Sequence, residues 1–383
     1  MPDAPRLPAP ARARRRLPGR CAMLWLLLAC WPALADGLAD YEHTAWVVGQ
    51  GAPGDIWDIA QADDGSLLLA TGTGLYRFDG RQFERREPPA GQAFPSSNMT
   101  TLAQDPDGTL WIAYYNAGIS RIDRHGLAHY QQAQGLPPGL VPRLARDGGG
   151  RLWAASDGGL RWFDGRRWQR PSPAMGIGDV PAQWLLRDRA GTLWLIADKR
   201  LWQLPATATR WQPLALAVAP FSTLALRADG QIWLADRQRG VMPVADVRGL
   251  LPAAEREARR VPGLLAKRIQ FTADGRLWGS LVDNGGIFQL DPAAPAGQRV
   301  ARFDAAQGLA STTAVPLLED RERNLWVGTN LGLNRFRMHV VHALALPGPA
   351  DPLRTLYQAP DAQVFAYGQD MQPMALRRDL LQA

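Results

Sequence analysis

Cysteine, lysine and histidine are all scarce in this chain of 383 residues. Its 2 cysteines, Cys21 and Cys30, fall within the first 35 residues, so the remainder has no thiol for disulfides, zinc–thiolate sites or cysteine catalysis. Lys199 and Lys267 are the only lysines among 43 basic residues. We attribute this scarcity to a compositional bias of the genome, and not to a phosphate-binding role.

The first 35 residues differ in character from the rest. Six arginines between Arg6 and Arg20 precede a largely apolar stretch, and Ala33-Leu34-Ala35 provides a small-x-small cleavage site. This order is typical of a secretory signal peptide, and it predicts a periplasmic protein whose mature chain begins near Asp36. The apolar stretch is short for a membrane span. Without residues 1–35 the formal net charge falls from +7 to about +2, so charge gives no reason to expect nucleic acid as a partner.

Long amphipathic helical patterns are also missing, whereas 38 glycines and 31 prolines indicate many turns. One unit recurs: a turn residue, followed three positions later by tryptophan or leucine. The turn residues are Gly65, Gly108, Gly150, Gly191, Gly230, Gly275 and Arg323, and their followers are Leu68, Trp111, Trp153, Trp194, Trp233, Trp278 and Trp326. Steps of 43, 42, 41, 39, 45 and 48 residues are typical of four-stranded propeller blades. The sequence therefore predicts an all-β fold, a seven-bladed β-propeller over residues 36–345 with four antiparallel strands per blade.

Each part of the unit has a physical cause. Asp105, Asp147, Asp188 and Asp320 can bond the backbone two residues on, and glycine accepts a positive φ, so the turn is tight. The tryptophan lies at the start of a strand, and in a lone small sheet one face of that strand would stay exposed to water. Stacked blades bury it. We therefore assign these repeated aspartates a structural role.

The ends of the chain raise the question of how the ring closes. Residues 41–51 read as a strand that completes the last blade, and residues 338–344 offer a competing strand; we favour the first. Residues 246–266 depart most from the repeat and are interpreted as an insertion at the rim, either a short helix or a solvated loop. Residues 346–383 are predicted to form a partial eighth repeat, or the start of a second propeller.

The segment from Asp320 to Phe336, DRERNLWVGTNLGLNRF, resembles the two-component regulator propeller repeat, as do DGTLWIAYYNAGISRID and GRLWAASDGGLRWFD. This resemblance covers nearly all of residues 40–340. It implies an exported sensor domain, with a histidine kinase or diguanylate cyclase module as the signalling partner, in cis or in trans, and a homodimer as a candidate assembly. Residues 36–383 contain none of the output domains that the family carries.

No constellation for catalysis stands out. The five histidines, His43, His125, His129, His339 and His342, are interpreted as surface or turn residues, because an HxxxH spacing on a strand does not build a metal face. Nucleophile-elbow, phosphate-loop and zinc-protease motifs are absent from the sequence. We therefore predict no catalytic residue, no metal and no cofactor.

Recognition is predicted at one rim of the ring. There, the loops between the second and third strands vary between copies while the strands repeat, as expected where a scaffold holds binding residues. The candidates are Tyr114, Tyr115, Asn116, Asp157, Asp198, Lys199, Asp236, Arg237, Arg239, Asp283, Asn284 and Asn330. Aromatic faces beside amides and carboxylates suit sugar rings, so an oligosaccharide or polysaccharide fragment is the candidate ligand.

Three functions follow from this interpretation. The first is an extracytoplasmic ligand-sensing propeller of a two-component or cyclic-di-GMP system. The second is a lyase-type enzyme, because lyase propellers that open cyclic antibiotics share the Gly-x-Leu-Trp signature; these need a metal and a catalytic histidine on the channel face. The third is a scaffold for protein assembly, which the same blades would serve.

Overall fold

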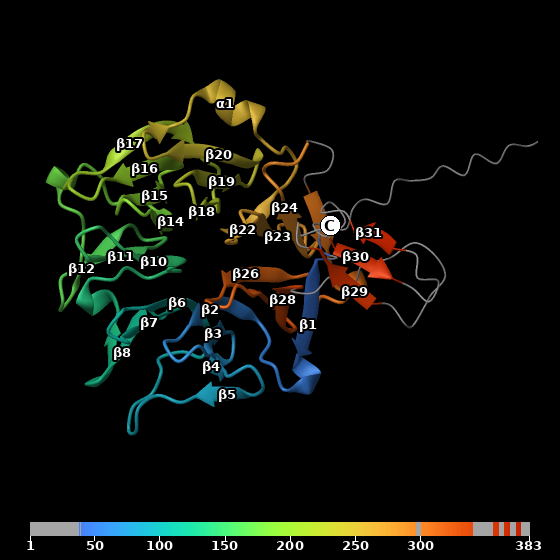
Figure 1. Ribbon diagram of the computed structural model, residues 1–383. Helices are drawn as coiled ribbons and strands as arrows, with labels where there is room; N and C mark the ends of the chain where they lie inside the picture. Colours follow the sequence, from blue (N-terminus) through green and yellow to red (C-terminus); the bar gives the residue numbers. More distant parts are fainter. Residues whose placement is uncertain are drawn as a thin grey trace, which may run out of the picture. The chain divides into compact units, whose positions relative to one another are not determined.

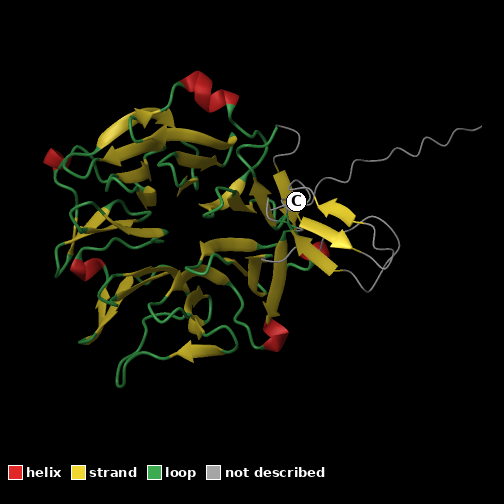
Figure 2. Ribbon diagram, in the orientation of Figure 1, coloured by secondary structure: helices red, strands yellow, loops and turns green. Residues whose placement is uncertain are grey.

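The computed structural model describes residues 38, 40–295, 300–339, 355–359, 364–367 and 373–376. Strands dominate this part of the chain, which has the single α-helix α1 (Ala253–Ala258) and four 3₁₀ helices of three residues (Figure 2). The described part includes no helix of the length and apolar character that crossing a membrane requires. The predicted signal peptide, residues 1–35, lies outside the described residues.

Seven four-stranded antiparallel sheets follow one another along the described chain. Blades one to three contain β2 (Ile56–Gln61), β3 (Leu67–Thr71), β4 (Gly74–Phe78) and β5 (Phe83–Arg86); β6 (Met99–Gln104), β7 (Leu110–Tyr114), β8 (Ile119–Asp123) and β9 (Gly126–Tyr130); and β10 (Arg143–Arg146), β11 (Leu152–Ala155), β12 (Arg161–Phe163) and β13 (Trp168–Gln169). Blades four and five contain β14 (Ala182–Arg187), β15 (Leu193–Ala197), β16 (Arg200–Leu204) and β17 (Gln212–Ala217); and β18 (Thr223–Leu226), β19 (Ile232–Asp236), β20 (Gly240–Asp246) and β21 (Gly249–Leu250). Blades six and seven contain β22 (Ala266–Phe271), β23 (Leu277–Leu281), β24 (Ile287–Leu290) and β25 (Val300–Phe303); and β26 (Ala314–Glu319), β27 (Leu325–Thr329), β28 (Gly332–Met338) and β1 (Tyr41–Val47).

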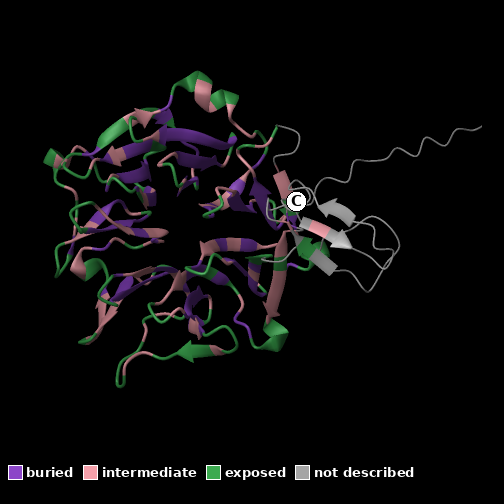
Figure 3. Ribbon diagram, in the orientation of Figure 1, coloured by how far each residue is buried: buried purple, intermediate pink, exposed green. Residues whose placement is uncertain are grey.

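The first strand of each blade lies nearest the axis of the propeller. These innermost strands contact one another in the order β2, β6, β10, β14, β18, β22, β26 and back to β2, so the blades form a closed ring (Figure 1). The predicted seven-bladed propeller is confirmed. The second strands are almost wholly buried, whereas outer strands such as β5 are largely exposed (Figure 3).

The amino-terminal strand β1 closes the ring. It pairs antiparallel with β28 over its whole length, from Tyr41 opposite Met338 to Val47 opposite Gly332. Within β1, Trp46 packs against both sides of the junction, with ring centres 5.7 Å from Trp326 in blade seven and 5.1 Å from Phe78 in blade one. Closure by the strand within residues 41–51, which the sequence favoured, is confirmed.

The repeated turn carries an interaction that the sequence interpretation did not anticipate. In four blades the turn aspartate accepts a hydrogen bond from the indole N–H of the tryptophan six residues later, at 2.7 to 2.9 Å. The pairs are Asp105 with Trp111, Asp147 with Trp153, Asp188 with Trp194, and Asp320 with Trp326. The aspartate thus satisfies the one polar atom of a buried indole. Its role is structural, as predicted, but it extends beyond the turn.

The tryptophans of the repeat hold neighbouring blades together. Trp153 of blade three meets Trp211 of blade four edge to face at 5.5 Å, and Trp233 of blade five meets Phe271 of blade six at 5.7 Å. Each buried indole removes about 150–250 Å² from water, which stabilises the ring by roughly 4–6 kcal/mol before entropy. Since this burial needs the next blade, no blade is complete by itself.

The departures from the repeat are accommodated locally. Arg323 adopts a φ of +65°, close to the +83° of Gly108, so it takes the glycine conformation at a turn where a side chain is disfavoured. The insertion over residues 246–266 contains β21 and the short helix α1, which selects the helical alternative. Three strands near the carboxyl end, β29 (Thr355–Gln358), β30 (Val364–Tyr367) and β31 (Pro373–Leu376), form an antiparallel sheet. All three strands lie within residues 346–383, for which the sequence predicts a partial eighth repeat or the start of a second propeller.

Candidate functional site

The ring has two rims, which differ in the loops they carry. In blade one, Ile56 pairs with Thr71 and Thr71 pairs with Gly74, so the start of the innermost strand and the loop between the second and third strands share one rim. We call this rim the loop face. The opposite rim, which carries the repeated turns, is called the turn face.

The loop face receives the predicted recognition residues. Most of them are exposed: Tyr115, Asn116, Asp157, Asp198, Lys199, Arg239, Asp283 and Asn284. Arg237 and Asn330 are half-buried, whereas Tyr114 and Asp236 are buried. The exposed large apolar side chains at this rim include Val48, Trp57, Tyr115, Phe221 and Leu331. Exposed aromatic groups beside polar loops are typical of ligand-binding surfaces.

Two of the predicted residues have interior roles. The hydroxyl of Tyr114 donates to Ser120 Oγ at 2.9 Å, and burial raises the pKa of Tyr114 to about 12. The carboxylate of Asp236 accepts from the backbone N–H groups of Ala219, Gln238 and Arg239, at 2.9 to 3.1 Å. These contacts hold the loop between β19 and β20 in place. Both side chains therefore support the loop face and do not form its surface.

The loops of blades five and six converge near the axis. Lys267 Nζ, on the innermost strand β22, donates to Asn284 Oδ1 at 2.8 Å. Burial lowers the pKa of Lys267, and the nearby positive charge of Arg237 lowers it further. Arg237 Nε in turn donates to the carbonyl of Phe221 at 2.9 Å. The structure thus brings the predicted residues Arg237 and Asn284 together, around a lysine that was not on the predicted list.

In six blades, one residue of the innermost strand pairs with the residue two positions after the tryptophan of the repeat, or after Leu68 in blade one. These residues of the innermost strands therefore occupy equivalent places. We call these the axial positions: Asp58, Thr101, Arg143, Trp184, Thr223 and Arg268. Each is followed by a buried aliphatic residue, namely Ile59, Leu102, Leu144, Leu185, Leu224 and Ile269. The residues that pack the blades are therefore alike, whereas the axial residues differ in size, charge and polarity.

Axial side chains commonly reach the innermost strand of the next blade. Asp58 accepts from the N–H of Leu102 at 2.9 Å, and Trp184 Nε1 donates to the carbonyl of Leu224 at 3.2 Å. Arg143 likewise lies over the indole of the following blade, with its guanidinium carbon 4.9 Å from the ring centre of Trp184. The axial residues therefore form a nearly continuous circle of side chains around the axis.

Arg268 does not follow this rule. Its guanidinium carbon lies 4.4 Å from the ring centre of Trp184, although Arg268 belongs to blade six and Trp184 to blade four. The side chain must therefore extend across the centre of the ring. Arg143, Trp184 and Arg268 together are called the guanidinium–indole cluster. Cation–π attraction of this kind contributes about 0.5–2 kcal/mol per pair.

Positive charge dominates in the guanidinium–indole cluster. Burial lowers the pKa of Arg268 to about 10; Asp58 opposes this shift, while Arg143 and Arg237 add to it. Within the described residues, neither the Arg143 nor the Arg268 guanidinium has a hydrogen bond or an ion pair. Two like charges held near one ring repel by roughly 2 kcal/mol at an effective dielectric near 20. Arg268 keeps its charge at neutral pH, and the Asp58 carboxylate offsets only part of the positive charge at the centre of the ring.

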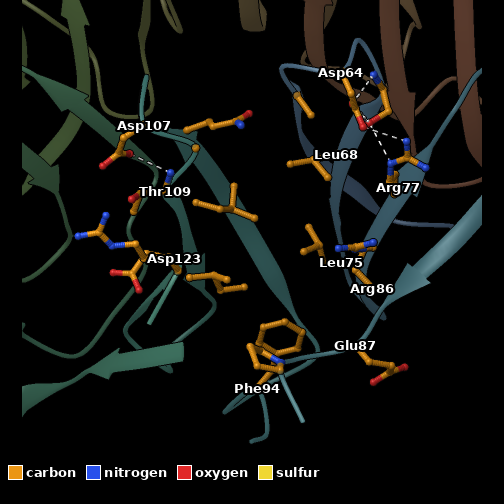
Figure 4. Close-up of a pocket in the computed structure, with 18 of the residues that line it drawn as sticks. Asp64, Leu68, Leu75, Arg77, Arg86, Glu87, Phe94, Asp107, Thr109 and Asp123 are labelled. Atoms are coloured by element: carbon orange, nitrogen blue, oxygen red, sulfur yellow. Dashed lines mark hydrogen bonds and ion pairs between the residues drawn. The ribbon is translucent and has the colours of Figure 1, made fainter. Parts of the chain in front are cut away.

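A second feature lies on the turn face, between blades one and two, where no predicted residue was placed. A cleft of about 900 Å³, the blade-one cleft, is lined by Leu68, Leu75, Arg77, Phe94 and Asp123 among others (Figure 4). The corresponding clefts after blades two and three measure about 320 and 160 Å³, and Trp111 and Trp153 line them. Blade one has Leu68 at the tryptophan position and Ala62 at the aspartate position, so the indole–carboxylate pair is missing there.

The four histidines within the described part of the chain lie away from the axis. His43 is on β1 against Phe303 and Phe336, and His129 is on β9, 3.1 Å from Ser120 Oγ. Burial lowers the pKa of both imidazoles. These two are therefore packed strand residues, which corrects the interpretation of all histidines as surface or turn residues. Among the described residues, no group of three His, Asp, Glu or Cys side chains could hold a metal ion.

The fold defines the class of this protein as a seven-bladed β-propeller with four-stranded antiparallel blades. Residues 93–116, which span β6, β7 and the loop after β7, match the sequence model of the two component regulator propeller family. The resemblance predicted from the sequence is thereby confirmed. Among curated proteins, no match to the chain is found.

Several solved structures share the fold. The extracellular domain of the proposed one-component system BT4673 from B. thetaiotaomicron has a TM-score of 0.60 at 15% identity, over 89% of this chain and 48% of that one. A catalytically inactive virginiamycin B lyase from Staphylococcus aureus, with quinupristin, has a TM-score of 0.58 at 12% identity, over 77% and 99%. PorZ, a surface component of the type-IX secretion system of Porphyromonas gingivalis, has a TM-score of 0.56 at 15% identity, over 85% and 59%. The chain thus spans about half the length of the BT4673 domain, and at these identities the likeness concerns the fold alone.

Proposed function

We propose that this chain is an extracytoplasmic ligand-sensing propeller of a two-component or cyclic-di-GMP signalling system. The observation that carries the proposal is the contrast between the blade-packing residues and the axial residues. The residues that follow the axial positions are all leucine or isoleucine, whereas the axial residues are one aspartate, one tryptophan, two threonines and two arginines. A scaffold that needed only to form a ring would have no reason to vary this position so widely. The proposed ligand-binding surface is the loop face, with its exposed aromatic groups and varied loops.

The comparisons support a signalling role. Residues 93–116 match a regulator propeller repeat, and the BT4673 structures are extracellular domains of proposed one-component or hybrid two-component systems. The signal peptide predicted from residues 1–35 would deliver the propeller to the periplasm. A kinase or cyclase module, in cis or in trans, would then read the ligand-dependent state of the propeller, alone or as a homodimer.

The lyase alternative is less well supported by the site. A virginiamycin B lyase shares the fold and is catalytically inactive when one histidine is replaced by alanine. A lyase of this kind is expected to need a catalytic histidine on the channel face. The four described histidines lie on outer strands or turns: His43 on β1, His125 before β9, His129 on β9 and His339 after β28. None of these four occupies an axial position. The site therefore favours binding without chemistry.

Thermal denaturation of the full chain against a library of neutral and acidic saccharides tests the proposal. A ligand present at 100 times its dissociation constant stabilises the folded state by about 2.7 kcal/mol, which raises Tm by about 4 °C for a domain of this size. The variant Tyr115→Ala, on the loop face, should reduce the shift, whereas Leu127→Ala, on the outer strand β9, should not. If no saccharide changes Tm and a protein partner does, the assembly scaffold becomes the better explanation.

A further inference from the structure

Positively charged side chains gather at the centre of the loop face. Two guanidinium groups, those of Arg143 and Arg268, share the indole of Trp184 and have no anionic partner among the described residues. Lys267 and Arg237 lie close by and add further positive charge. Asp58 is the one carboxylate among the axial positions, and its Oδ2 already accepts from the N–H of Leu102.

The side chains of this cluster are placed for contact with a ligand. Arg143, Arg268 and Lys267 are each partly exposed, although the indole beneath the two arginines is buried. The guanidinium carbons lie 4.9 and 4.4 Å from the ring centre of Trp184, and no hydrogen bond occupies their N–H donors among the described residues. Planar guanidinium groups bind carboxylates, sulfates and phosphates through paired hydrogen bonds.

We propose that the guanidinium–indole cluster binds an oxyanion, carried by the ligand that the propeller senses. Arg143 and Arg268 would hold the anion from two sides, and Lys267 would add a third positive charge from the rim. The inference deepens the proposed sensing function, and it rests on that function for its biological meaning. It narrows the candidate ligands from oligosaccharides in general to acidic ones, or to small phosphorylated or carboxylated molecules.

A structural reason for the cluster would be different. If the arginines served only to fill the centre of the ring, their removal would lower stability and would have no effect on anion affinity. The present geometry predicts the opposite, since two like charges near one indole repel each other. Removing one of them should raise the stability of the protein in the absence of anions and weaken anion binding.

Isothermal titration calorimetry of the full chain at pH 7 tests the proposal with three probes: inorganic phosphate, a uronic-acid disaccharide and a neutral disaccharide of the same size. We expect at least one anionic probe to bind, and its affinity to fall as salt increases. Arg143→Gln and Arg268→Gln should each weaken it at least 10-fold, because a charge-assisted hydrogen bond is lost. The control Arg302→Gln, an exposed arginine on outer strand β25 of the same blade as Arg268, should leave affinity unchanged.

Each outcome decides a separate point. Binding of phosphate and disaccharide alike supports a general oxyanion site, and binding of the acidic disaccharide alone supports an acidic sugar. Anion binding that survives in both axial variants would overturn the axial site. Binding of only the neutral disaccharide would overturn the anion inference while keeping the sensing proposal, whereas a chain that binds no probe and no library saccharide would count against both. If a glutamine variant fails to fold, Arg268→Lys keeps the charge and should retain part of the affinity.

Discussion

Restoring the missing indole–carboxylate pair in blade one should close the blade-one cleft and stabilise the ring. The double variant Ala62→Asp, Leu68→Trp places in blade one the residues that blades two, three, four and seven have at the same spacing. Leu68 is 9% exposed and lines the cleft of about 900 Å³, whereas the six tryptophans at this position are 0 to 5% exposed. The cleft therefore has room for the larger side chain.

The expected gain can be worked out from burial and hydrogen bonding. A tryptophan buries roughly 70 Å² more apolar surface than a leucine, which at about 25 cal/mol per Å² is worth about 2 kcal/mol. A hydrogen bond from the indole to a carboxylate adds about 1 kcal/mol. Together these should raise the free energy of unfolding by about 3 kcal/mol and Tm by about 5 °C. Ala62→Asp alone should destabilise by about 1 kcal/mol, because its carboxylate has no indole to accept from.

Urea denaturation of the wild type, both single variants and the double variant gives the coupling energy between positions 62 and 68. We expect a favourable coupling of at least about 1 kcal/mol. Leu331→Trp, at an exposed site on the loop face, is the matched control and should change stability by less than about 0.5 kcal/mol. A destabilised Leu68→Trp variant with no coupling to position 62 would refute the view that the cleft exists because this pair is missing.

Three further predictions concern the same elements. Asp188→Ala should lower the free energy of unfolding by about 2–4 kcal/mol, because the buried Trp194 indole and the Thr192 N–H lose their acceptor. Asp229→Ala, at an exposed turn, is the control and should lower it by less than about 1 kcal/mol in urea denaturation. Equal losses in the two variants would contradict the role assigned to Asp188. Arg323→Gly should raise the free energy of unfolding by up to about 1 kcal/mol, and Tm with it, because the φ of +65° at this position suits glycine. A lower Tm would contradict this reasoning. Burial lowers the pKa of His43 below its ordinary 6.5, so the unfolded chain takes up a proton first and stability should fall as pH drops below about 6.5. His43→Phe, measured by urea denaturation between pH 5 and 8, should lose part of that dependence, and an unchanged pH profile would show that His43 does not cause it.

Much of the architecture could be predicted because the blade is a local unit. The turn glycine, the tryptophan three residues later and the alternating strand all lie within one short segment, so the repeat, the number of blades and the order of strands were readable. Ring closure by β1 was also predictable, since a strand ahead of the first blade needs a partner. The hydrogen bond from Trp194 to Asp188 was missed, although the recurring spacing of six residues between aspartate and tryptophan was a signal for it.

The candidate site was predictable only in part. The sequence placed recognition residues in the loops between second and third strands, and it included Arg237 and Asn284, which the structure brings together near the axis. It also included Tyr114, whose side chain is buried, because a residue at the end of a strand can point to either side. The axial positions were missed, since a single varied residue within a regular strand carries no local signal.

The sequence by itself determined that this protein is a ring of seven blades, because each blade's turn and strand pattern is encoded within about 40 consecutive residues. Only the tertiary structure decided what lies at the centre of that ring. Arg143, Trp184 and Arg268 come from blades three, four and six, and they meet because the innermost strands all surround one axis. Side chains so far apart in the sequence come into contact only after the ring has closed, so no local sequence pattern could have predicted this cluster.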